Sequence, residues 1–262
     1  MIIDIHVHPY ISAQDDFARI LHEAEKYDAR LWVYSLLPRA IKPPVHWLPT
    51  ADYCRQANDD VIELMRQFPE RVEGFAYVNP LVGELAVKEL DRCVGEHGMI
   101  GMKLWIAVRC SDAVVDPLID RCAYHGIPML QHTWLKATGN MPGESTPMDL
   151  AVLARRHPNA TLIMGHSGGD WEYGVRCARS LENVFFDISG GEANSGWIER
   201  AVDLVGAERI LFGTDMPGRS MSSQLAKVLG ARISDDAKEK ITYKNAARIL
   251  ERAGRARPVA AR

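Results

Sequence analysis

The chain has 262 residues, of which 47% are apolar and 25% charged, and its formal net charge is -3. This composition is typical of a soluble globular protein, and the mixed, nearly balanced charge excludes a nucleic-acid-binding or anionic-membrane-binding protein. None of the five cysteines is spaced as CxxC, so neither a disulfide framework nor a zinc ribbon is indicated.

Eight short segments rich in apolar and β-branched residues recur along the chain and predict β-strands. They cover residues 2–8, 30–37, 72–79, 99–105, 127–132, 161–166, 183–189 and 209–215. The first lies at the N-terminus, where residues 1–8 have neither the basic start nor the apolar length of a signal peptide or membrane helix. We therefore expect a cytoplasmic protein that does not bind membranes.

Segments with the apolar spacing of amphipathic helices lie between these strands, at 16–27, 59–68, 84–94, 148–157 and 196–205. A further helix is predicted near the C-terminus, with Ser234 as its N-cap and Gly254 as its end. The strands repeat about every 30 residues, the size of a βαβ unit. The sequence therefore predicts a TIM-type (β/α)₈ barrel, α/β in class, with residues 1–262 forming a single domain.

Polar side chains end several of these strands. In the first strand His6 and His8 are two residues apart, so they share one face with Cα atoms about 6.6 Å apart, and both can reach one ion. Such a pair alone is weak evidence, since two histidines on a polar strand face are often incidental.

The ends of three later predicted strands strengthen that evidence, because they carry His132, His166 and Asp215. All strand C-termini converge on one rim of a barrel, so these groups should become neighbours of His6 and His8. Histidines and one carboxylate suit a catalytic zinc that keeps an exchangeable water. The alternative is an unrelated set of core histidines.

The motifs HVH, QHT, GHSGG, FFDIS, FGTDMP and KNAARIL occur in this order between residues 2 and about 252. Their series resembles the amidohydrolase superfamily, and within it the amidohydrolase-related branch that includes aminocarboxymuconate semialdehyde decarboxylase. The resemblance implies that the metal ligands are His6, His8, His132 and Asp215. It also implies that His166 is the catalytic histidine, which polarises the substrate or moves protons.

Lys103 in the fourth predicted strand decides the expected number of metals. Strand alternation places it on the inner face with Met99, Gly101 and Trp105, and an inward lysine is costly unless it is paired or modified. We favour one zinc ion, with Lys103 paired to Asp4 or to a substrate carboxylate. In binuclear relatives the equivalent lysine is carboxylated and bridges two ions, with histidines at the positions of His132 and His166 holding the second.

Other residues near the predicted rim have two interpretations each. Asp187 could orient a metal ligand or cap the next loop. Trp105 and Trp134 could form walls of a substrate pocket or pack beneath the loops. Arg109 and Arg219 could bind a substrate carboxylate, although exposed surface arginines are more frequent.

The preferred function is hydrolysis of a small ester, lactone or amide by a metal-activated water, with Asp215 as proton carrier and His166 polarising the carbonyl. The same residues permit nonhydrolytic decarboxylation of an unsaturated or aromatic acid. A catalytically idle barrel is disfavoured because every member of the site is present. A small molecule is the expected partner, and the chain could form a homo-oligomer.

Overall fold

The computed structural model describes residues 1–10, 17–41, 46–252 and 254. All eight predicted strands are confirmed, and they form one parallel sheet in which each strand pairs with its neighbours in sequence. The strands are β1 (Ile2–Val7), β2 (Ala29–Val33), β3 (Val72–Tyr77), β4 (Gly101–Leu104), β5 (Met129–Gln131), β6 (Leu162–Met164), β7 (Val184–Asp187) and β8 (Ile210–Leu211). Each is shorter than its predicted segment.

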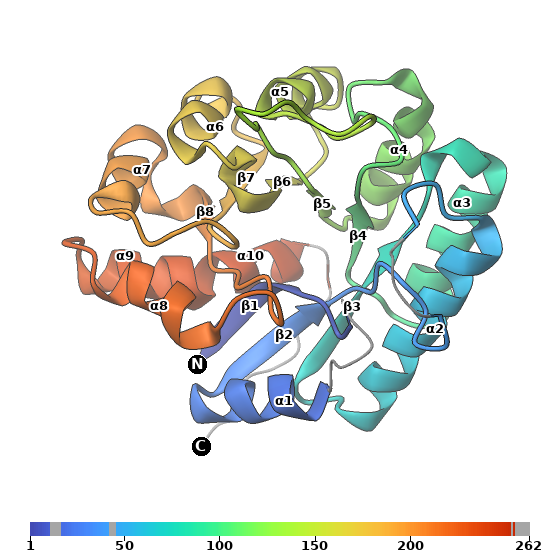
Figure 1. The fold of residues 1–262 in the computed structure, drawn as a ribbon, viewed down its shortest axis with the longest axis horizontal. Coiled ribbons are helices and arrows are strands. Elements are labelled where there is room, and N and C mark those ends of the chain that lie inside the picture. The colour runs from blue at the N-terminus through green and yellow to red at the C-terminus, as the bar shows by residue number, and fades with distance from the viewer. Residues whose placement is uncertain (11–16, 42–45, 253, 255–262) are drawn as a thin grey trace.

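Residues after β8 close the sheet against β1. The amide of Ile5 donates to the carbonyl of Phe212 at 3.0 Å, and the amide of His8 donates to the carbonyl of Met216 at 2.8 Å. Figure 1 shows the resulting ring, with the helices arranged around it. The predicted TIM-type barrel is therefore confirmed.

Helices follow each of the strands and form the outer layer. They are α1 (Phe17–Lys26), α2 (Ala51–Gln67), α3 (Glu84–Asp91), α4 (Asp116–His125), α5 (Pro147–Arg156), α6 (Trp171–Ala178), α7 (Trp197–Val205), α8 (Met221–Leu229), α9 (Asp235–Glu239) and α10 (Asn245–Arg252). Ser234 caps α9 as predicted, accepting a hydrogen bond from the Ala237 amide. A π-helical turn, Lys240–Lys244, joins α9 to α10. Among the described helices none is long and apolar enough to cross a membrane.

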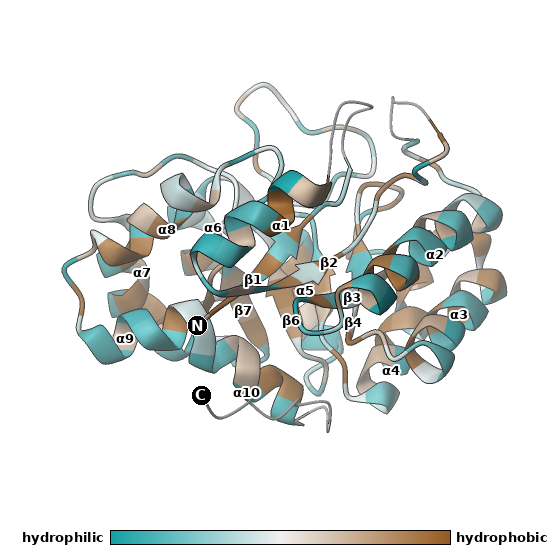
Figure 2. Cartoon of the chain, turned by 90° about the horizontal axis from the view of Figure 1, so that it is seen from below, coloured by the Kyte–Doolittle hydropathy of each residue, from teal (hydrophilic) through white to brown (hydrophobic). Residues whose placement is uncertain are grey.

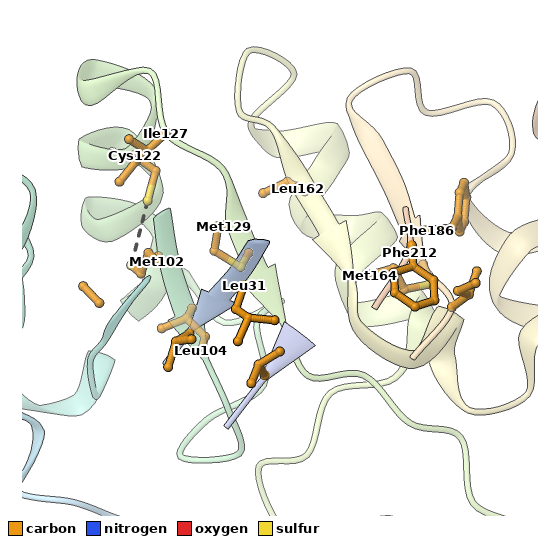
Figure 3. Packing of buried hydrophobic residues seen from close by; sticks show 14 of the residues in the cluster. Leu31, Met102, Leu104, Cys122, Ile127, Met129, Leu162, Met164, Phe186 and Phe212 are labelled. Carbon is orange, nitrogen blue, oxygen red and sulfur yellow. Dashed lines mark hydrogen bonds between the residues drawn. The ribbon is translucent and has the colours of Figure 1, made fainter. Parts of the chain in front are cut away.

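The buried apolar side chains separate into two clusters. The outer cluster lies between strands and helices, and Figure 3 shows part of it, where Met102 of β4 meets Cys122 of α4 with the two sulfur atoms 3.8 Å apart. Figure 2 shows the complementary pattern, with hydrophilic residues on the outward faces of the helices. The inner cluster fills the barrel with Ile3, Ile5, Trp32, Tyr34, Leu36, Cys54, Phe75, Tyr77, Ile100, Leu130, Ile163, Phe185, Leu211, Ala246, Ile249 and Leu250.

The first strand does not keep one alternation along its length. Its register against β2 shifts between Asp4 and Val7, where three residue steps along β1 pair with two along β2. Ile3 and Ile5 belong to the inner cluster, yet the next residue, His6, also points into the barrel mouth. The register shift is a β-bulge, and it explains why two consecutive side chains face the same side of the strand. The prediction that Asp4 shares the inner face with His6 is therefore wrong.

Candidate metal centre

Each predicted site residue lies in or just after the carboxyl end of a strand. His6 is in β1, His132 directly follows β5, His166 lies in the turn Gly165–Gly168 after β6, and Asp215 follows β8. The ligand atoms of His6, His166 and Asp215 lie within 4.8 Å of one another, which is the arrangement of a potential metal site. The barrel thus brings together residues separated by up to 209 positions in sequence, from 6 to 215.

His8 and His132 surround this group. His8 Nε2 is 3.3 Å from Asp215 Oδ1, and the His6 and His8 rings have centroids 5.5 Å apart. The His132 ring centroid is 5.1 Å from that of His166. All five predicted residues therefore converge, although the tightest trio contains His166 rather than His8 or His132.

The backbone is strained where it presents these groups. His166, Ser167 and Asp215 have positive φ angles of 56°, 46° and 69°, although none is glycine. Such conformations cost about 1–3 kcal/mol each and persist where the surroundings determine them. At these positions the His166 and Asp215 side chains lie beside His6 in the barrel mouth.

Asp187 holds two histidines of the group in place. Its Oδ2 accepts from His6 Nδ1 at 2.6 Å and from the His166 amide at 3.1 Å. The Ser189 hydroxyl, which the sequence analysis did not identify, donates to the same oxygen at 2.5 Å and lies 2.9 Å from His6 Nδ1 and 3.1 Å from His166 Nδ1. Ser189 sits two residues after Asp187, a spacing that gave no separate signal.

The free nitrogen of His6 supports the fit of a divalent ion. Because Nδ1 is bonded to Asp187, Nε2 is the remaining ligand atom; it is buried without a hydrogen-bond partner and lies 3.6 Å from Asp215 Oδ1. A buried polar atom without a partner is costly in a protein interior. Imidazole and carboxylate groups around such an atom suit a transition-metal or zinc ion.

The electrostatics keep these groups in their metal-binding forms. Burial lowers the pKa of His6 to about 4 and also lowers the pKa values of His132 and His166, so the rings stay neutral. Burial alone would raise the pKa of Asp215, but the hydrogen bond from His8 and the nearby histidines hold it below its usual range. Asp215 is therefore a carboxylate at neutral pH, and its side chain is 26% exposed.

Lys103 points into the barrel as predicted, and its partner is Tyr34. Lys103 is 1% exposed, and its Nζ donates to the Tyr34 hydroxyl at 3.1 Å, while the Tyr34 ring packs against His6 and His8. The expected pair with Asp4 is not formed, because Asp4 accepts from the Thr214 hydroxyl at 2.6 Å. Burial lowers the pKa of Lys103 to about 7, although the negative charges of Asp187 and Asp215 act in the opposite direction and raise it.

The aromatic and basic candidates divide into two groups. The Trp134 ring is stacked on His132 with centroids 6.2 Å apart and lies 5.1 Å from the His166 ring, so it borders the site. Trp105 is half-buried and packs against the inner cluster. Arg109 and Arg219 are exposed, and Arg219 donates to the carbonyl of Gly218.

Glu144 is a second residue that the sequence analysis did not identify. It is 1% exposed, and its Oε1 lies 3.0 Å from His132 Nε2. A glutamate among polar loop residues has no distinctive pattern, so nothing in the sequence singled it out. Glu144 lies twelve residues after His132 in the sequence, and only the folded loop shows that its carboxylate contacts the His132 ring.

Comparison with known proteins identifies relatives of the whole chain. The sequence profile of the amidohydrolase family matches residues 3–252. Gamma-resorcylate decarboxylase from Polaromonas sp. is 23% identical, covering 92% of this chain and 88% of its own. The 2-amino-3-carboxymuconate-6-semialdehyde decarboxylase of Dictyostelium discoideum is 22% identical, covering 88% and 75% respectively.

Solved structures share the fold. The 2,6-dihydroxybenzoate decarboxylase from Rhizobium has a TM-score of 0.74 at 18% identity, covering 95% of this chain and 98% of its own. The dihydroxybenzoic acid decarboxylase from Polaromonas sp., solved with manganese and the inhibitor 2-nitroresorcinol, has a TM-score of 0.70 at 21% identity, covering 89% and 85%. At these identities the structural likeness establishes the barrel alone.

Proposed function

The chain belongs to the amidohydrolase family of enzymes, and we propose that it is a metal-dependent, nonhydrolytic decarboxylase of a small aromatic or unsaturated carboxylic acid. The observation that carries this proposal is the group of His6, His166 and Asp215, in which His6 Nε2 is buried without a hydrogen-bond partner, in a chain whose relatives over most of its length are named as decarboxylases. Decarboxylation thus takes the place of hydrolysis, which was the function preferred from the sequence alone.

The residues offered to a divalent ion are His6, His8, His132 and Asp215, as the motifs implied, with His166 beside them. Bound there, the ion would act as a Lewis acid toward oxygen atoms of the substrate. Zinc and manganese are both candidates: the donor set suits zinc, whereas one structural neighbour holds manganese. One ion remains our proposal, because Lys103 already has a protein partner, the Tyr34 hydroxyl, to which its Nζ donates at 3.1 Å.

The chain's own groups supply orientation and a proton. Trp134, stacked on His132 and close to His166, offers an aromatic wall to a flat ring. In decarboxylation the bond from carbon to carboxylate breaks, carbon dioxide leaves, and the carbon takes one proton instead. Asp215 is suited to carry that proton because its side chain is partly exposed and lies beside His8.

A panel assay tests this proposal against hydrolysis, which the partly exposed Asp215 carboxylate also permits through proton abstraction from water. Purified enzyme loaded with Zn²⁺ or Mn²⁺ would be offered dihydroxybenzoates and unsaturated dicarboxylic acids, and separately esters, lactones and amides. We expect carbon dioxide release from the acids that stops after chelation. Turnover confined to the ester, lactone or amide panel would overturn the decarboxylase proposal.

A further inference from the structure

The loop between β5 and α5 is folded back on the barrel rim. Thr133 pairs with Ser145 in a parallel bridge, and the Trp134 amide donates to the Ser145 carbonyl at 2.9 Å. Gly143 has φ +78°, and a Cβ there would lie 2.3 Å from the Ile106 carbonyl oxygen. The close approach at this glycine fixes the position of the next residue, Glu144.

Glu144 is buried although much of the loop around it is exposed. Its carboxylate accepts from the Met141 amide at 2.9 Å, and both oxygens accept from Lys136 Nζ at 2.8 Å. Its Oε1 is also 3.0 Å from His132 Nε2. Burying a carboxylate is costly unless it is paired and hydrogen-bonded, so this one is fully provided with donors.

We propose that Glu144 is the positioning residue of His132, and that Lys136 holds its carboxylate in place. With the Nε2 proton donated to Glu144, the His132 ring takes the tautomer in which Nδ1 carries no proton and can bind a metal. Metal-binding histidines commonly donate their second nitrogen to a carboxylate that fixes the ring orientation. Asp187 has the same relation to His6, at 2.6 Å. The inference rests on the proposed metal-dependent function.

The competing explanation is that Glu144 only stabilises the fold of the loop. Asp149 provides a matched control, because it also anchors this loop through a capping box with Thr146 and a hydrogen bond from Ser111 but makes no hydrogen bond to a site histidine. A purely structural role predicts similar behaviour of Glu144→Gln and Asp149→Asn. A positioning role predicts that only the Glu144 variant changes the metal centre.

The test measures Co²⁺ affinity of the full chain by competition with a chromophoric chelator, together with the visible spectrum of bound Co²⁺ and circular dichroism. Glu144→Gln should weaken binding by about 10–100-fold and alter the spectrum, whereas Asp149→Asn should leave both unchanged. An affinity of folded Glu144→Gln equal to that of the wild type overturns the inference. If Glu144→Gln did not fold, the same measurements would be made on Lys136→Met. We expect a smaller loss of Co²⁺ affinity in that variant. An affinity equal to that of the wild type would overturn the inference.

A double-mutant cycle tests whether Glu144 acts through His132. In a His132→Ala background, Glu144→Gln should cause no further loss of Co²⁺ affinity, because the ring that it positions is absent. An equal further loss would show that Glu144 acts independently and would overturn the inference, while leaving the proposed function intact. Failure of the wild type to bind Co²⁺, Zn²⁺ or Mn²⁺ would instead overturn the proposed function itself.

Discussion

The barrel mouth and the barrel interior are built from the same strands but differ in the polarity of their side chains and in their contacts. In β7, Phe185 belongs to the inner cluster, and two residues later Asp187 binds His6. In the same way, Leu130 of β5 belongs to the inner cluster, whereas His132, two residues later, contacts Glu144. In the interior the contacts are mainly between apolar side chains, whereas in the mouth the side chains make specific polar contacts such as those of His6 with Asp187 and of His132 with Glu144. Substitutions in the two regions should therefore affect different measurements.

Asp215→Asn should give the largest effect in the mouth. The substitution keeps the size of the side chain but removes its basic carboxylate, so turnover should fall by about 10²–10⁴-fold, or roughly 3–5 kcal/mol in the activation barrier. Because the side chain is partly exposed, the unfolding midpoint should hardly change. Steady-state rates, metal analysis and urea unfolding test this together. Turnover within tenfold of the wild type would leave Asp215 as a replaceable ligand.

Gly101→Ala should show the opposite pattern in the interior. A Cβ on Gly101 would lie 2.2 Å from Cε1 of Phe75, so overpacking should cost about 1–3 kcal/mol of unfolding free energy. Metal affinity should stay close to that of the wild type. A second substitution, Phe75→Leu, should recover part of the loss by making room.

The control for this prediction is Gly95→Ala, because nothing lies within 4 Å of a Cβ at Gly95. Its unfolding free energy should stay within about 1 kcal/mol of the wild type. Equal destabilisation by both substitutions, measured by urea unfolding, would contradict the close packing of Phe75 against β4.

Asp187→Asn tests how far the mouth depends on its supporting carboxylate. The change weakens the bond from His6 Nδ1 and removes a charge, so metal affinity should fall by about 10–100-fold. Asp203→Asn, on the exposed face of α7, is the charge-matched control and should have no effect. Competition with a chelator measures the metal affinity of both variants. An unchanged affinity in Asp187→Asn would show that Asp187 supports only the fold and not the metal centre.

Lys103 lies at the boundary between the two regions and should produce a smaller, pH-dependent effect. Its pKa in the folded chain is lowered to about 7 by burial, below the value of about 10.4 for an unfolded lysine. Between these values the unfolded chain binds more protons, so the unfolding free energy should rise with pH by up to about 1.4 kcal/mol per unit. This contribution is absent below the folded pKa.

Lys103→Met should abolish that contribution. Its unfolding free energy, measured in urea at pH 7.5 and 9.5 without added metal, should rise less across this window than that of the wild type. Parallel pH dependence in the two proteins would mean that Lys103 keeps its proton in the folded chain up to the higher pH.

Much of the site was predictable because barrel topology converts strand ends into neighbours. His6, His8, His132, His166 and Asp215 were identified from their positions in the predicted strands, with their roles implied by the family resemblance, and the structure brings all five together. The inward direction of Lys103 followed from alternation within β4. The same rule placed Met99 on the inner face, which is wrong: Met99 lies in the outer cluster, because the strand begins only at Gly101.

The sequence by itself determined the eight-strand barrel, the residues of its rim and the family, since each depends on local periodicity or on short motifs. Only the tertiary structure decided the partners of those residues. Tyr34 replaces Asp4 beside Lys103 because a bulge in β1 changes the alternation. Ser189 joins the site from the segment directly after β7, and Glu144 joins it because the loop after β5 folds back to the rim. Partner choice depends on register shifts and loop closure, which involve contacts between distant segments and leave no periodic trace in the chain.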